Sequence, residues 1–268
     1  MKCDITILVD NNAAPGSGLL PEHGFAALIE ADGRRLLFDT GQGEALPLNA
    51  ARLGVDLSDL DALVFSHGHY DHTGGGLAVL SQQTKPLPVF YGSGAFVPDL
   101  SPRLHGTGSR GIQYSTEAAS GYGAQLRELD KPHRFTDRLL ITGPIPRAPG
   151  GSTAAPEEQA LAIILDEGLV IVSGCAHAGV SETIAYVCEV TGVERVRAFV
   201  GGTHIGGYEP GKVERLVREF AAWPVSEWVV GHCTGASGLE AFLAVMPDRT
   251  RPLAAGSRFS FGVPLHGS

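Results

Sequence analysis

Short apolar runs recur along the chain and predict a protein rich in β-strands. Each run is bounded by glycine, proline or polar residues, which is typical of strands that end in turns. In the first half such runs occupy residues 5–9, 25–29, 35–38, 62–65 and 89–91, and in the second half residues 139–142, 160–165, 169–172, 198–200 and 228–230.

A second periodicity, with apolar residues three or four positions apart, predicts helices between these strands. In the first half it predicts a short helix over residues 44–53 and another that begins near Thr73. In the second half it marks three apolar helix faces: Ile184, Val187 and Cys188; Val213, Leu216, Val217 and Phe220; and Leu239, Phe242, Leu243 and Met246. Because strands and helices mix in both halves, we expect an α+β protein with two sheets and helices packed outside them.

One stretch, from about residue 92 to residue 135, sustains neither period. Glycine, serine and isolated charges interrupt it. We expect a loop-rich excursion there, and long excursions in compact enzymes often cover a site.

The composition is that of an ordinary globular protein, with 18% charged and 43% hydrophobic residues. The formal net charge of −9 would repel a phosphate backbone, so we expect no nucleic-acid partner. A small anionic substrate is still compatible with this charge, because a metal ion or local arginines can reverse the sign of the potential within a pocket.

The short apolar stretches and the scattered cysteines predict a cytoplasmic protein. No apolar stretch is long enough to span a bilayer and no N-terminal signal peptide is visible, so we expect no membrane partner. The four cysteines, Cys3, Cys175, Cys188 and Cys233, form no CxxC pair, which is typical of reduced thiols. We therefore expect a cytoplasmic protein that acts on a small molecule, and the sequence does not indicate its oligomeric state.

Histidines gather where predicted strands end. The run 62–65 is followed by HGHYDH, residues 67–72, and three later runs are followed by the segments GCAH (174–177), GTH (202–204) and GHC (231–233). A lone histidine at a strand end is more often structural or merely exposed, but four such segments in one chain favour a shared purpose. Because the strands of one sheet end at a common edge, we expect these side chains to converge on one site.

The spacing within HGHYDH suits metal binding. His67 and His69 are two positions apart on an extended turn, so both rings can face the same way and hold one cation. Asp71 and His72 follow where a helix begins and can hold a second cation nearby. Imidazole and carboxylate are good ligands for zinc, iron or manganese, and open coordination positions let a bound water ionise near neutral pH.

The segment HGHYDH resembles the signature of the metallo-β-lactamase superfamily. Asp39-Thr40-Gly41 after a strand, the HxHxDH motif and histidines in the second half follow that family's order along the chain. The resemblance covers nearly the whole chain. It implies a single domain over residues 1–268, folded as a four-layer αββα sandwich of two mixed sheets flanked by helices, with one or two metals at the edge of the sheets.

More narrowly, the chain is similar to a subfamily named for a dihydropterin–ribofuranosylaminobenzene phosphate synthase. The segments that carry this likeness are LVDN, EHG, LLFDTGQ, SHGHYDHTGG, EQAL, SGCAHAG, GGTHI and HCTG. The likeness constrains the fold and the metal more closely than the substrate.

The resemblance implies a binuclear site with two divalent ions, Zn²⁺ as the first choice and iron or manganese as alternatives. The implied ligands are His67, His69 and His177 for one ion, and Asp71, His72 and His232 for the other. Where many members have a bridging aspartate, this chain has Cys175. Cys175 can be a thiolate ligand, can lie behind the ligands or can be a small buried residue, and a sulfur ligand would favour zinc or iron over magnesium.

Other residues complete the predicted site. His204 can replace His177 or His232 as a ligand or donate a hydrogen bond to substrate; we favour the second role and pair it with Asp71 as the catalytic residues. Asp39 either fixes the tautomer of a ligand imidazole or only forms a turn. The candidates for substrate contact are Asn11, His23, Arg103, Arg110 and Arg147, since arginine grips phosphate or carboxylate through paired N–H donors. Each of these could instead be a turn or surface residue.

Three functions are compatible with such a site. The first, which we favour, is a metallohydrolase that uses metal-activated water on a small, anionic phosphoester, ester or lactone. The second is a transferase or synthase acting on a pterin or aromatic ribose phosphate with the metal as Lewis acid, although aromatic residues make up only 7% of the chain and no stacking pocket is obvious. The third is an iron-binding redox or sensory protein without hydrolytic turnover.

Overall fold

The computed structural model describes residues 1–103, 107–147 and 157–262. The first half contains β1 (Cys3–Val9), β2 (Ala26–Ala31), β3 (Arg34–Phe38), α1 (Ala45–Leu53), β4 (Ala62–Val64), α2 (Tyr70–Thr73), α3 (Gly76–Ser81), β5 (Leu87–Gly92), α4 (Thr116–Gly121), β6 (Ala124–Leu129) and β7 (His133–Arg134). The second half contains β8 (Leu139–Ile141), β9 (Ala160–Leu165), β10 (Gly168–Ser173), α5 (Val180–Thr191), β11 (Val196–Gly201), α6 (Pro210–Ala221), β12 (Val225–Val230), α7 (Gly235–Val245), β13 (Thr250–Pro252) and β14 (Arg258–Phe261).

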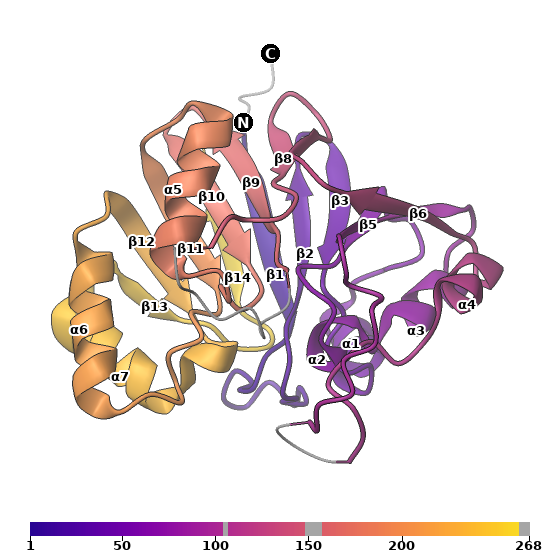
Figure 1. Ribbon diagram of the computed structural model, residues 1–268, viewed down its shortest axis with the longest axis horizontal. Helices are drawn as coiled ribbons and strands as arrows, with labels where there is room; N and C mark the ends of the chain where they lie inside the picture. The colour runs from indigo at the N-terminus through magenta and orange to yellow at the C-terminus, as the bar shows by residue number, and fades with distance from the viewer. Residues whose placement is uncertain (104–106, 148–156, 263–268) are drawn as a thin grey trace.

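Two seven-stranded mixed sheets face each other and carry helices on their outer sides. One has the order β14-β1-β2-β3-β4-β5-β6, and the other has the order β13-β12-β11-β10-β9-β8-β7. Helices α5, α6 and α7 cover the second sheet, while α1, α3 and α4 pack on the outside of the first (Figure 1). The predicted four-layer αββα sandwich is therefore confirmed.

The central strands are apolar on both faces because each face meets a different core. In β10, Leu169 and Ile171 pack toward the helices, whereas Val170 and Val172 pack toward the other sheet. This division follows from the alternation of side chains along a strand. The continuous apolar runs of the sequence thus mark strands buried between a helical layer and a second sheet.

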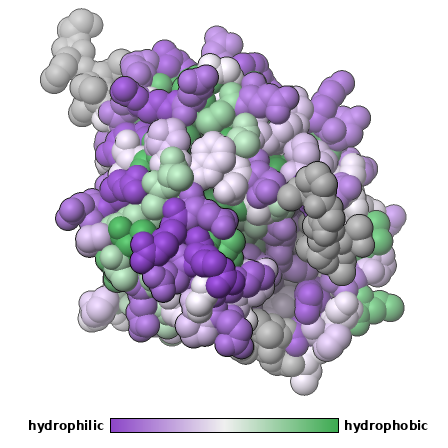
Figure 2. Space-filling model, turned by 60° about the vertical axis from the view of Figure 1, so that its left-hand side comes forward, coloured by the Kyte–Doolittle hydropathy of each residue, from purple (hydrophilic) through white to green (hydrophobic). Residues whose placement is uncertain are grey.

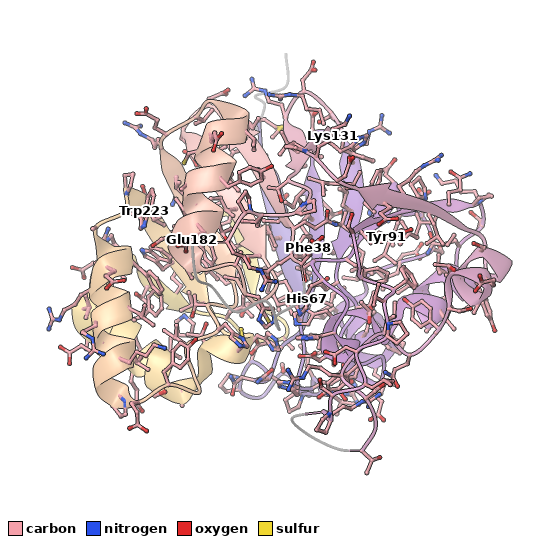
Figure 3. The ribbon with its side chains drawn as sticks, in the orientation of Figure 1. Phe38, His67, Tyr91, Lys131, Glu182 and Trp223 are labelled. Atoms are coloured by element: carbon pink, nitrogen blue, oxygen red, sulfur yellow. The ribbon has the colours of Figure 1, made fainter. Side chains whose placement is uncertain are left out.

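Parallel pairing brings the important strand ends to one edge. β3, β4 and β5 run parallel in the first sheet, and β10, β11, β12 and β13 run parallel in the second. Their carboxyl ends lie at the lower side of the sandwich in the view of Figure 3, where His67 is found below Phe38. The histidine segments therefore come from both sheets, and they converge at this shared side of the sandwich as expected.

The stretch from about 92 to 135 is more regular than its composition indicates. It ends in α4, β6 and β7, although residues 93–98 and 107–115 contain no helix or strand. β6 lies at the edge of its sheet, so Gln125 and Glu128 are exposed and the strand lacks a continuous apolar run. No prediction covered β13 and β14, which are short edge strands near the C-terminus.

The outer surface of the second helical layer is polar. Figure 2 brings the α5–α6–α7 side forward and shows mostly hydrophilic side chains with small, separated hydrophobic areas. In α6, Val213, Val217 and Phe220 are buried while the remaining positions are mostly exposed. None of the helices in the described part of the chain is long and apolar enough to cross a membrane.

The core between the sheets should dominate stability, and Phe38 tests this. Its side chain is fully buried there, so Phe38→Ala should lower the free energy of unfolding by about 3–5 kcal/mol. Urea denaturation of the metal-free protein would measure the loss. The control is Leu100→Ala, because Leu100 is 82% exposed and should change stability by no more than about 0.5 kcal/mol. Equal effects of the two substitutions would contradict the assignment of this core.

Candidate metal centre

The turn after β4 places four ionisable side chains in the interior. His67, His69, Asp71 and His72 are between 0% and 8% exposed. The short helix α2 begins at Tyr70, and the Thr73 hydroxyl donates a hydrogen bond to the His69 carbonyl at 2.9 Å. The turn is also held against the second sheet, because the Gln159 side-chain amide donates to the Phe65 carbonyl at 2.8 Å.

Three turns of the second sheet face this segment. Cys175 and His177 follow β10, His204 follows β11, and His232 follows β12. Ala176, His204 and His232 have φ values of 57°, 51° and 49°, a left-handed conformation that residues other than glycine adopt rarely. Strain of this kind is common where a fold holds functional side chains in place.

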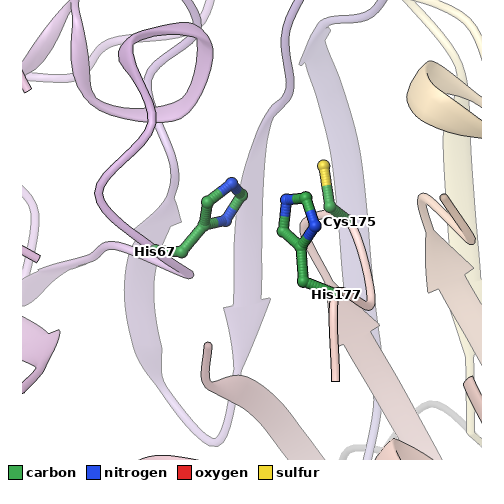
Figure 4. Close-up of side chains that lie close together, drawn as sticks. All are labelled: His67, Cys175 and His177. Atoms are coloured by element: carbon green, nitrogen blue, oxygen red, sulfur yellow. The ribbon is translucent and has the colours of Figure 1, made fainter. Parts of the chain in front are cut away.

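The ligand atoms of the described residues form four groups, two of which adjoin at the centre of the site: His67 with Cys175 and His177, and His72 with Cys175 and His232. Within each group the atoms lie within 4.8 Å of one another. The rings of His67 and His177 lie edge to face with their centroids 4.7 Å apart, and Figure 4 shows the sulfur of Cys175 near them. Each group has the reach and the donor types of a metal site.

Nitrogen–nitrogen distances fit shared ions. His67 Nε2 lies 3.0 Å from His69 Nδ1, and His72 Nε2 lies 3.1 Å from His232 Nε2. Two nitrogens bound tetrahedrally to one zinc ion lie roughly 3.3 Å apart. The spacing is therefore close to that of imidazoles that bind one ion.

Hydrogen bonds on the far side of the rings set the tautomers. His72 Nδ1 lies 2.7 Å from Asp39 Oδ2, and His232 Nδ1 lies 2.9 Å from Asn11 Oδ1, so each Nδ1 carries the proton and donates. The two Nε2 lone pairs then face each other in a buried space, where a metal ion can bind both. The residues present fit a metal ion on this observation.

Asp39 acts on both groups at once. Besides His72, its carboxylate accepts hydrogen bonds from the Ser66 backbone N–H and the Ser66 hydroxyl, both at 2.7 Å. The Ser66 oxygen in turn lies 2.9 Å from His67 Nδ1 and can accept its proton. Asp39 therefore orients one imidazole of each group, directly or through Ser66.

Burial keeps most of the imidazoles neutral. It lowers the pKa of His67 and His177 well below the usual range and lowers those of His69 and His232 to about 4. His72 differs: burial opposes its charge, but Asp71 and Asp39 outweigh this and raise its pKa to about 9. A proton on His72 would fill the gap between the facing rings until a metal ion replaced it.

Asp71 is the anion of the second group. Its Oδ2 lies 3.2 Å from His23 Nε2, 3.5 Å from His232 Nε2 and 3.6 Å from His72 Nε2. Although burial opposes the charge, these imidazoles hold the pKa of Asp71 well below its usual range. His23, expected at the substrate, therefore also stands where it could ligate an ion together with Asp71 and His232.

The other expected residues take varied positions. Asn11, expected at the substrate, also donates from Nδ2 toward His23 Nδ1 at 3.3 Å, so its amide lies between two imidazoles. His204 is exposed at the rim, with its ring centroid 4.2 Å from that of His177, and its backbone N–H donates to Cys233 Sγ at 3.2 Å. A separate hydrogen bond between the Cys233 side chain and the imidazole raises the pKa of His204.

The excursion brings two of the three arginines to the motif. The Arg103 guanidinium stacks 4.2 Å above the Tyr70 ring, and the Arg110 carbonyl accepts a hydrogen bond from the Tyr70 N–H at 2.8 Å. Burial and the charges of Arg110 and His72 together oppose protonation of His69. Arg147 is half-buried and adjoins residues 148–156, which lie outside the described part of the chain.

Sequence reasoning gave no role to Ser66 and Glu158. The Glu158 carboxylate is 1% exposed and accepts the backbone N–H groups of Cys175 at 3.1 Å and Ala178 at 3.2 Å, and burial raises its pKa to about 7. The Asp10 carboxylate accepts a hydrogen bond from the His232 backbone N–H at 2.8 Å, and burial raises the pKa of Asp10 to about 7 as well. The segments EQAL and LVDN carried the signal, but only the fold shows which backbone these carboxylates hold.

Comparison with known proteins gives consistent relatives. Residues 19–187 match the family model described as Metallo-beta-lactamase superfamily. The chain is 25% identical, over 96% of both chains, to the 7,8-dihydropterin-6-methyl-4-(beta-D-ribofuranosyl)-aminobenzene-5'-phosphate synthase of Methanocaldococcus jannaschii. It is 27% identical to an uncharacterized protein of the same archaeon, over 88% of this chain and 92% of the other.

A solved structure is similar throughout. Tm1679, titled a metal-dependent hydrolase of the beta-lactamase superfamily, superposes with a TM-score of 0.76 at 25% identity, over 96% of this chain and 98% of the other. The recognition made from HGHYDH is thus confirmed.

Asp39→Asn tests the orienting role of this carboxylate. The amide keeps only one acceptor oxygen, which the Ser66 backbone N–H needs, so its NH2 group faces His72 Nδ1 and donates to it. His72 should then move its proton to Nε2 and lose its free lone pair. Metal affinity should fall roughly 10–100-fold, measured by competition with a chromophoric chelator. The matched control is Asp61→Asn, which removes a surface carboxylate that bonds Arg34. Unchanged affinity in Asp39→Asn would contradict the role.

Proposed function

Because the chain belongs to the metallo-beta-lactamase superfamily, we propose that it is a metal-dependent hydrolase acting on a small anionic substrate. The superfamily binds divalent metal ions, and the names of the relatives indicate an enzyme. The reaction and the substrate class are our inference. The observation that carries it is the pair of buried imidazoles, His72 and His232, whose free nitrogens face each other at 3.1 Å.

The ligands proposed for one ion are His67, His69 and His177. Those proposed for the second are Asp71, His72 and His232. Zinc suits these nitrogen and oxygen donors, with iron or manganese as alternatives. When bound, such ions lower the pKa of a coordinated water and stabilise negative charge that develops on the substrate.

Asp71 and His204 are the proposed catalytic residues. The imidazoles around Asp71 keep it ionised, so it can accept a hydrogen bond from the attacking water and orient it. His204 stands at the exposed rim beside His177 and can donate a hydrogen bond to the oxygen that gains charge. Both roles depend on positions that buried neighbours fix.

The proposed substrate carries a phosphate or carboxylate, as in a phosphoester or an acidic lactone. Arg103 stacks on Tyr70 and the charge of Arg110 acts on His69, so both give this side of the site positive charge in a chain of net charge −9. Arginine suits such groups because its N–H donors match two anionic oxygens. Arg147 stays a further candidate.

A second candidate function comes from the archaeal relative, which is named as a synthase and aligns over 96% of both chains. In that case the same ions would act as Lewis acids on an aromatic ribose phosphate. A pterin titration followed by fluorescence quenching, run beside a screen of phosphodiester, thioester and lactone substrates, separates the two functions. Pterin binding without any hydrolysis would favour the synthase.

Metal removal tests the hydrolase directly. Dialysis against a chelator should abolish turnover of the best substrate from the screen, and one to two equivalents of zinc should restore it. His67→Ala and Asp71→Ala should be inactive while keeping the circular dichroism of the parent protein. Turnover in metal-free protein would reject this mechanism.

His204→Asn tests the rim histidine. Asparagine tolerates the left-handed backbone at this position, so the fold should survive. The kcat should fall roughly 10²–10³-fold while the metal content and KM change little. His133→Asn is the control, since His133, in β7, stacks on Phe90, in β5. A variant that loses metal instead would make His204 a ligand.

A further inference from the structure

We propose that the thiolate of Cys175 bridges the two metal positions, in the place where many family members have a carboxylate. The inference rests on the proposed metal centre but not on the reaction carried out there. Cys175 is the one residue common to the groups around His67 and around His72. Its sulfur lies 3.2 Å from His72 Nε2.

No carboxylate in the described residues competes for this position. Asp71 belongs to the group of His23 and His232. Asp39 lies behind the rings, where Ser66 and His72 occupy both of its oxygens. Glu158 binds the backbone of the Cys175 turn, so it supports the sulfur from behind.

The turn fixes the position of the sulfur. A Cβ at Gly174 would lie 2.2 Å from Ser66 Oγ and 3.0 Å from Asp39 Oδ2, so the backbone before Cys175 packs directly on the orienting pair. Ala176 after it is left-handed, and Glu158 holds the Cys175 N–H. Zinc–sulfur bonds of about 2.3 Å and zinc–nitrogen bonds of about 2.0 Å put S and N roughly 3.5 Å apart, close to the distance from Cys175 to His72.

A sulfur bridge has a chemical consequence for metal choice. Binding converts the thiol to a thiolate and releases its proton to solvent. Soft thiolate then favours zinc, iron or cobalt over magnesium or manganese. The centre should therefore select metals differently from a centre with a carboxylate bridge.

Cobalt titration tests the bridge. Metal-free protein is titrated with Co²⁺ while the thiolate-to-cobalt charge-transfer absorption is recorded, and mass spectrometry counts the ions bound. We expect the absorption to grow over the first and the second equivalent, because each ion gains a bond to the same sulfur. An absorption complete after one equivalent, or two bound ions without any, would overturn the bridge.

Four substitutions assign the sulfur to one cysteine. Cys175→Ser should abolish the absorption, and Cys175→Asp, a second variant in case the first does not fold, should abolish it while supplying a carboxylate. Cys188→Ser, on α5, and Cys233→Ser should keep it. Loss of the absorption in Cys233→Ser instead would assign the sulfur to the neighbouring group of Cys175, His204 and Cys233 and overturn the proposal.

The outcome is separable from that of the proposed function. The absorption reports ligation whether or not any substrate turns over. Hydrolysis without the thiolate absorption would reject the sulfur bridge and support the hydrolase. The absorption without hydrolysis would support the sulfur bridge and reject the hydrolase.

Discussion

The buried Asp39 carboxylate is the interaction on which the site depends. It accepts hydrogen bonds from the Ser66 backbone N–H, the Ser66 hydroxyl and the His72 ring, all at 2.7 Å. The Ser66 oxygen in turn contacts His67 Nδ1. An unpaired carboxylate in the interior would be costly, and burial indeed raises its pKa. The hydrogen bonds from Ser66 and His72 offset that cost. They also orient the His67 and His72 rings so that the Nε2 atoms of both point into one buried space.

The fold was predictable from the sequence where burial on both faces leaves a continuous apolar run, as in β9, β10 and β12. It was less predictable at the sheet edges. In β6, Gln125, Arg127 and Glu128 are exposed, which breaks the apolar run. β14 pairs only with β1, which is far away in the sequence. No local pattern records such a distant partner, so edge strands escape reasoning that reads neighbouring residues alone.

The candidate site divides in the same way. His67, His69, Asp71 and His72 sit in six consecutive positions, so their spacing alone indicates a shared task. Ser66 and Glu158 have no such signature. Serine and glutamate are common residues. Ser66 and Glu158 matter only because they lie beside the His67 ring nitrogen and the Cys175 backbone N–H. That relation exists only after two sheets have met.

The pairing of β14 with β1 has a consequence for how the protein is made. During synthesis β1 (Cys3–Val9) is made before the other strands of the two sheets, and its outer edge has no neighbour until Arg258–Phe261 leaves the ribosome. An apolar strand with an open edge is a template for association with other chains. The nascent chain therefore exposes this edge while every other strand of the two sheets is being made.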